Sequence, residues 1–241
     1  MSTRKALDNR YTVSQVMVLA LKLFWRRMGL LLPANLLWLG LSLLVVTWPA
    51  ATAGLFALAR RVADEELGAD PQPATLADFW AGFRAHWRRG SLLALSDLAA
   101  IVLIAVAMRF YGESQPPLSW LVGPITLVGL AWAGAQLYLF PLMLQREGRG
   151  PLAVLREALL IAISYPLNTI SLLVTVLILA AAATLLAGPV LLVFFAFLAL
   201  LQTVAVRAVL AERGEIALRM TPEQRAALER ERVASIEDNA S

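Results

Sequence analysis

The residues that could do chemistry in this chain are few. The sequence has one histidine, His86, and no cysteine, so thiolate ligands, disulfides and paired-histidine sites are excluded. It also contains no Gly-x-Ser-x-Gly turn, no phosphate-binding glycine loop and no dinucleotide-binding fingerprint. We therefore expect no catalytic residues, no metal site and no cofactor, and a protein that is not an enzyme.

Polar side chains inside apolar segments form the candidate intramembrane polar site: Asn35, Asp97, Gln136 and Asn168. A carboxylate in an apolar helix is costly, so Asp97 should face the bundle interior, either paired or protonated. One hypothesis makes Asp97 a proton- or substrate-linked acid of a transport cycle. The other makes it a group that hydrogen-bonds between helices with Asn35 and Asn168. Under both hypotheses we expect these three residues to face a common interior site.

The elements that must position these residues are apolar helices. Hydrophobic residues make up 59% of the chain and charged residues 16%, with a mean hydropathy of +0.70, whereas soluble proteins carry about 25% charged residues. Segments 28–59, 114–145 and 158–206 contain no charged residue, and 90–108 contains only Asp97. A helical crossing needs about 20 residues, so 158–206 should hold two spans, with a hinge at Gly188-Pro189. This composition predicts an integral membrane protein.

The positions of Lys and Arg predict the topology. A six-span arrangement places 20 of the 21 Lys and Arg on one side of the membrane and only Arg109 on the other. The alternative with one long first helix has five spans and a weaker charge asymmetry. The positive-inside rule therefore favours six spans with cytoplasmic N and C termini. The net charge of +4 then reflects arginines that flank the membrane, and we expect no nucleic-acid partner.

The predicted fold class is all-α, a polytopic transmembrane helix bundle of about six spans arranged as three helical hairpins. Residues 1–213 form the membrane domain and 214–241 a short cytoplasmic helical tail. A weak internal repeat supports the hairpins, since Trp25-Arg26-Arg27 recurs as Trp87-Arg88-Arg89 and each second arm opens near a proline. The predicted spans are about 28–47, 50–64, 90–111, 118–144, 163–187 and 190–210.

Amphipathic cytoplasmic helices are expected before each hairpin, at 11–27, 75–89 and 151–164. In the clearest case, Thr75 and Asp78 form a capping box. Four aromatic residues then fall on one helical face and are expected to be interfacial anchors: Phe79, Trp80, Phe83 and Trp87. This helix lies either in the headgroup layer or packed under the bundle. Small residues in the second span, among them Ala53, Gly54 and Ala57, should permit close helix packing there.

The first half of the chain resembles the YesL family of bacterial membrane proteins. The resemblance rests on Asn35-Leu36-Leu37-Trp38-Leu39, Val45-Val46-Thr47, Pro49-Ala50-Ala51-Thr52-Ala53 and Asp78-Phe79-Trp80-x-x-Phe83. The sequence departs from the family at Leu44, where proline is common, and at Trp48, where glycine is common. The match covers about residues 20–110.

This resemblance implies a bacterial cytoplasmic (inner) membrane protein of a family without an assigned function. Its members often occur near genes for carbohydrate ABC transporters, so the expected partners are the lipid bilayer and sugar ABC transporter components or another membrane protein. We expect a non-enzymatic accessory or scaffold component associated with carbohydrate uptake. The alternative is a small transporter or permease that uses the intramembrane polar residues.

Overall fold

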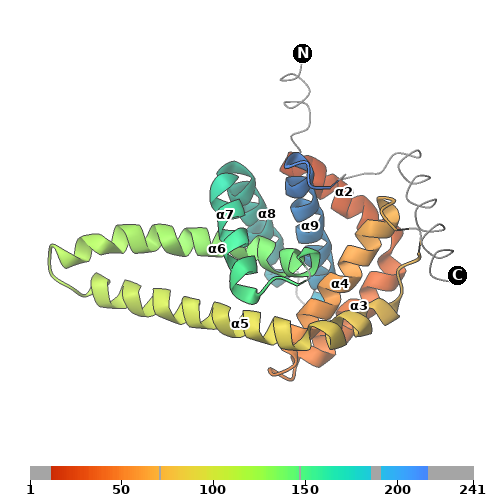
Figure 1. Ribbon diagram of the computed structural model, residues 1–241, viewed down its shortest axis with the longest axis horizontal. Coiled ribbons are helices and arrows are strands. Elements are labelled where there is room, and N and C mark those ends of the chain that lie inside the picture. Colours follow the sequence, from red (N-terminus) through yellow and green to blue (C-terminus); the bar gives the residue numbers. More distant parts are fainter. Residues whose placement is uncertain (1–11, 71, 147, 186–190, 217–241) are drawn as a thin grey trace, which may run out of the picture.

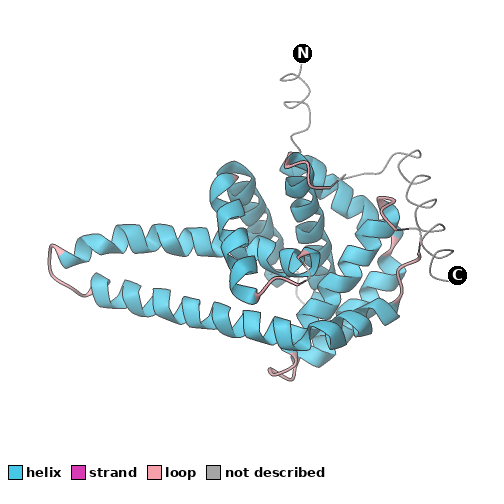
Figure 2. Cartoon of the chain, viewed as in Figure 1, coloured by secondary structure: helices cyan, strands magenta, loops and turns pink. Residues whose placement is uncertain are grey.

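The computed structural model describes residues 12–70, 72–146, 148–185 and 191–216, and every regular element in these ranges is helical (Figure 2). The all-α class predicted from sequence is thereby confirmed for the described residues. In chain order the elements are α2 (Val13–Arg26), α3 (Met28–Ser42), α4 (Trp48–Glu66), α5 (Leu76–Gly112), the 3-10 helix η1 (Leu118–Leu121), α6 (Val122–Gln145), α7 (Pro151–Ser164), α8 (Pro166–Leu185) and α9 (Leu191–Glu212).

Local signals set several helix ends. α7 has the predicted bounds, because Pro151 occupies a first-turn position that needs no N–H donor. α5 begins after Thr75, whose backbone N–H donates to the Asp78 carboxylate at 2.7 Å, as the capping box predicted. The hinge at Gly188-Pro189 and the charged tail helix lie outside the described residues.

One helix differs from its prediction. The amphipathic segment 75–89 and the span 90–111 form a single 37-residue helix, α5, rather than two elements. Gly90 does not break it. A Cβ at Gly90 would lie 3.2 Å from the carbonyl oxygen of Pro49, so the missing side chain serves a close approach of α4. α5 thus joins the expected cytoplasmic segment to the expected span without interruption.

Among the described residues, four helices are long and apolar enough to cross a bilayer, namely Leu76–Gly112, Leu118–Gln145, Pro166–Thr184 and Val193–Glu212. These helices support a membrane protein. The first predicted span is the 15-residue α3, shorter than the roughly 20 residues that one crossing needs. The second predicted span, α4, ends in a charged segment. Six spans and three hairpins therefore stay predictions.

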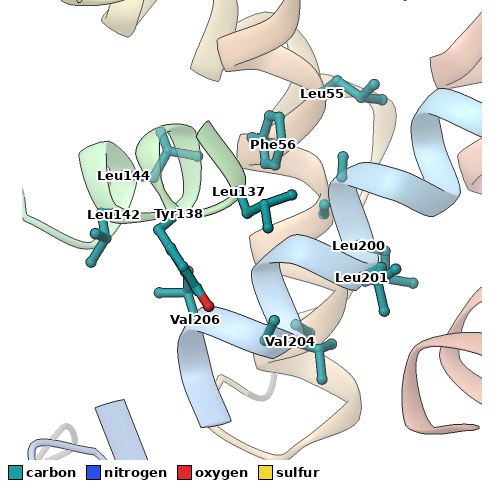
Figure 3. Close-up of a cluster of buried hydrophobic side chains, with 14 of the residues drawn as sticks. Leu55, Phe56, Leu137, Tyr138, Leu142, Leu144, Leu200, Leu201, Val204 and Val206 are labelled. Atoms are coloured by element: carbon teal, nitrogen blue, oxygen red, sulfur yellow. The ribbon is translucent and has the colours of Figure 1, made fainter. Parts of the chain in front are cut away.

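α9 lies at the centre of the bundle and contacts α2, α3, α4, α6 and α8. In an 18-residue apolar stretch of α9, 72% of the residues are buried. Figure 3 shows the core on one side of it, where Leu137 and Tyr138 of α6 point toward α9 and Phe56 of α4 belongs to the same cluster. The rings of Phe56 and Phe140 stack at 5.5 Å, which fixes α4 against α6.

The small residues predicted to permit close packing do so where α4 meets α5. A Cβ at Gly54 would lie 2.8 Å from the Phe79 carbonyl oxygen, and one at Gly82 would lie 2.3 Å from the Cβ of Ala57. Neither position has room for a methyl group. Ala53 is fully buried beside them. The expectation of tight packing is confirmed for this pair of helices.

α5 and α6 extend away from the remaining helices as a long hairpin, closed by η1 at its tip (Figure 1). In the corresponding 18-residue apolar stretch of α5 only 6% of the residues are buried, against 72% in α9. Large apolar side chains are exposed along the hairpin, including Leu95, Leu103, Phe110, Trp120 and Leu127. We call residues 91–136 the projecting hairpin.

Candidate functional site

Two of the four candidate intramembrane residues meet inside the projecting hairpin. The Gln136 amide of α6 donates a hydrogen bond to the Asp97 carboxylate of α5, and both residues are half-buried. Both residues belong to the polar site predicted from the sequence, but the predicted neighbours of Asp97 are Asn35 and Asn168. A hydrogen bond between helices in an apolar medium holds the two arms together. The carboxylate is therefore oriented by a partner on the facing helix.

Asn35 lies in a different part of the bundle. Its side chain is fully buried, and its Oδ1 accepts a hydrogen bond from the backbone N–H of Ala196 at 2.9 Å. Close by, the rings of Trp38 and Phe195 are 4.1 Å apart. The amide of Asn35 therefore ties α3 to the first turns of α9.

Asn168 is half-buried at a third place, on α8. It borders a pocket of about 20 Å³ together with Tyr138, Val16 and Glu212, about the volume that one water needs. Tyr138 and Thr169 share a hydrogen bond of 3.0 Å beside it. Asn168, Asn35 and Asp97 thus have different neighbours. The common site for all three residues stays a prediction.

The four predicted interfacial anchors lie along the first half of α5. Successive rings of Phe79, Trp80, Phe83 and Trp87 contact one another, with centroids 5.9, 5.6 and 5.6 Å apart. Phe79 is fully buried, while Trp80 is 38% exposed. The backbone of Phe79 and Phe83 packs on Gly54 of α4. Of the two placements left open, these contacts favour a helix packed on the bundle, with Trp80 at its outer edge.

A charged groove that the sequence does not predict lies between α4, α5 and the end of α6. It has a volume of about 340 Å³ and is bordered by Arg60, Arg61 and Asp64 of α4, by Asp70, and by Asp78 and His86 near the start of α5. The arginines had been interpreted only as membrane-flanking residues. The signal that could have revealed the groove is the Arg60–Asp64 spacing of four residues, which places opposite charges on one helical face.

Ion pairs fill the inner end of this charged groove. The buried guanidinium of Arg207 on α9 pairs with the Asp64 carboxylate, which also lies 3.6 Å from Arg60. Arg60 in turn donates to the backbone carbonyl of Leu144. Arg61 pairs with Asp70 and lies 3.5 Å from Asp78. These ion pairs link α4 to α9 and to α5. They therefore hold the walls of the charged groove together.

A second set of ion pairs lies at neighbouring helix ends. Arg27 pairs with Glu65 and Glu66 of α4, and its hydrogen bond to Glu66 raises the pKa of the guanidinium above its usual value. Arg146 pairs with Glu157 and Glu215, and its hydrogen bond to Glu157 likewise raises its pKa. These arginines are charged at any physiological pH, so the pairs act as permanent links rather than as proton carriers.

Within the described ranges, no group of three or more His, Cys, Asp and Glu residues could hold a metal ion. The carboxylates of the charged groove instead face arginines. This arrangement suits structural cohesion.

Residues 31–108 match a family described as "Protein of unknown function, DUF624". The match spans α3, α4 and most of α5, and so includes Asn35, Asp97 and the charged groove except Leu144. No curated protein and no solved structure shows significant similarity to the chain.

Proposed function

We propose that this protein is a non-enzymatic accessory or scaffold subunit of the bacterial cytoplasmic membrane, and that its projecting hairpin binds a second membrane protein. The observation that carries the proposal is the low burial of α5, at 6% of its most apolar window, in a helix that is anchored firmly at its other end. Leu103 is 69% exposed on this hairpin and Leu127 is 68% exposed.

The hairpin is suited to protein binding because it is held as one unit. The Gln136–Asp97 hydrogen bond joins its arms, and Ile104 of α5 packs beside Gly129 of α6, with its Cγ2 atom 3.6 Å from the position that a Cβ would take there. Association between helices in a membrane depends on packing and on such hydrogen bonds, because lipid tails are as apolar as leucine. A preorganised pair of helices pays less ordering entropy on binding than two separate ones.

The proposed partner is a membrane component of sugar uptake, such as a subunit of a carbohydrate ABC transporter. This part rests on the resemblance to the YesL family, with which the match of residues 31–108 to a family of unknown function is consistent. The proposed orientation has cytoplasmic N and C termini. It rests on the positions of Lys and Arg and on the ion pairs of Arg27 and Arg146 at helix ends.

A small permease is the alternative function. It requires the intramembrane polar groups to converge on a water-accessible path. The hydrogen bonds of Asn35 to Ala196 and of Gln136 to Asp97 engage these groups in contacts between helices. They therefore favour the accessory role.

Photocrosslinking from single positions on the hairpin tests the proposal. A photoreactive amino acid at Leu103 or Leu127 should yield, in intact cells, an adduct with the same transporter subunit from both positions. Ile104 is the matched control, since it is next to Leu103 but faces α6, and it should crosslink within the chain. Adducts with lipid alone from both exposed positions would overturn the proposed function.

A further inference from the structure

α2 is an amphipathic helix with one face packed and the other open. Its inner face buries Val16, Ala20, Leu23 and Phe24, and the Phe24 ring contacts Phe197 of α9 at 5.7 Å. The outer face is mixed, because large apolar side chains are exposed there beside Lys22 and Arg26. Trp25 is 65% exposed there, with two further apolar side chains of α2 about half exposed.

Two adjoining apolar hollows run along this outer face. One has a volume of about 460 Å³ and lies between α2 and the end of α4, bordered by Leu21, Trp25 and Leu67. The other, of about 320 Å³, lies toward the start of α2. Both hollows share Val18, Leu19 and Lys22. Lys22 therefore borders both hollows, and we call the pair the α2 groove.

The charges at the rim of the α2 groove are mainly positive. Lys22 forms no ion pair with any described residue, and Arg26 on the next turn is 67% exposed. The acid at this rim, Glu66, is already engaged by both Arg26 and Arg27. Tryptophan beside Lys and Arg is typical of a helix at the level of lipid headgroups.

We propose that the α2 groove is a binding site for an anionic diacyl phospholipid. Its phosphate lies between Lys22 and Arg26, and its two acyl chains occupy the two apolar hollows on either side of Lys22. Basic groups near a bilayer surface attract anionic headgroups, and the apolar walls bury the chains. The groove would thereby distinguish anionic lipid from zwitterionic lipid with the same chains. This site is independent of the projecting hairpin and of its proposed partner.

Quenching of Trp25 fluorescence by brominated lipids tests the site. The purified full chain is reconstituted in phosphatidylcholine nanodiscs that contain a small fraction of dibrominated phosphatidylglycerol or dibrominated phosphatidylcholine. The Trp25 signal is the difference between the wild type and Trp25→Phe, because the chain has 7 tryptophans. We expect the preference of the site for phosphatidylglycerol over phosphatidylcholine to gain a factor of about five from each of the two basic residues. This factor corresponds to about 1 kcal/mol of attraction per basic residue.

Two charge-removing variants separate a site from general attraction to the protein. Lys22→Gln should lower the preference for phosphatidylglycerol about fivefold. Arg84→Gln removes the same charge from an exposed position on α5 outside the α2 groove and should leave the preference unchanged. Lys22 is exposed, so its replacement does not perturb the core. Equal quenching of Trp25 by the two brominated lipids in the wild type, or equal effects of the two variants, would overturn the proposal.

Discussion

The buried ion pair between Arg207 and Asp64 gives the sharpest test of the charged groove. We consider Arg207→Met, Asp64→Leu and the double variant. Arg207 is 6% exposed, and its guanidinium pairs with the Asp64 carboxylate across 143 positions of sequence. Breaking a buried pair by removing one partner leaves an uncompensated charge and costs about 3–5 kcal/mol.

The surroundings decide which single variant costs more. In Arg207→Met the remaining Asp64 carboxylate keeps Arg60, 3.6 Å away on the same helix. We therefore expect a loss near the lower end of the range, about 3 kcal/mol. In Asp64→Leu the buried guanidinium of Arg207 faces the like charge of Arg60, and we expect about 5 kcal/mol. With both partners apolar no buried charge remains, so the double variant should lie within about 1 kcal/mol of wild type.

Unfolding in mixed dodecylmaltoside–SDS micelles, followed by tryptophan fluorescence, measures these free energies. The decisive quantity is the coupling energy of the double-mutant cycle between Asp64 and Arg207. Additive losses in the double variant would refute the reasoning, because they would mean that the two side chains stabilise the bundle separately. The reverse order of the single variants would show that Arg60 does not shield the carboxylate.

Three further predictions concern packing, the hairpin and topology. Gly82→Ala should destabilise the fold by about 1–3 kcal/mol through overpacking, while Gly123→Ala, which has open space around its Cβ position, should not; thermal unfolding compares them. Asp97→Asn should preserve thermal stability and crosslinking because an amide oxygen still accepts a hydrogen bond, and a folded variant that lost crosslinking would assign the negative charge a role. A cysteine at Ser114 should react with an impermeant reagent in intact cells and one at Ala69 only after permeabilisation; the opposite pattern would reverse the topology.

Features with a local cause were predictable from sequence. Pro151 fixed the start of α7, and Thr75 with Asp78 fixed the start of α5. The small side chains of α4 indicated close packing before its partner helix was known, because Gly54 and its neighbours leave no bulk at the interface. In each case the signal lies within a few residues of the structure that it determines.

Features that depend on distant partners were not predictable in this way. Arg207 was interpreted as a membrane-flanking residue, since nothing near it in sequence names Asp64 as its partner. Asp97 and Gln136 are recognisable in the sequence as polar residues within apolar segments. Their pairing, however, depends on how α5 lies against α6. In the sequence, Gly90 cannot be told from a glycine that ends a helix. The structure shows that it instead makes room for the backbone of Pro49.

The continuity of α5 makes it a rigid lever. Its first half is held against α4, and the 23 residues from Gly90 to Gly112 extend for about 34 Å at 1.5 Å per residue. A rotation of 10° at the α4 contact would displace the tip by about 6 Å, as follows from that length. Because the charged groove and the hairpin tip lie on one uninterrupted helix, any shift of α5 at the groove would also move the tip.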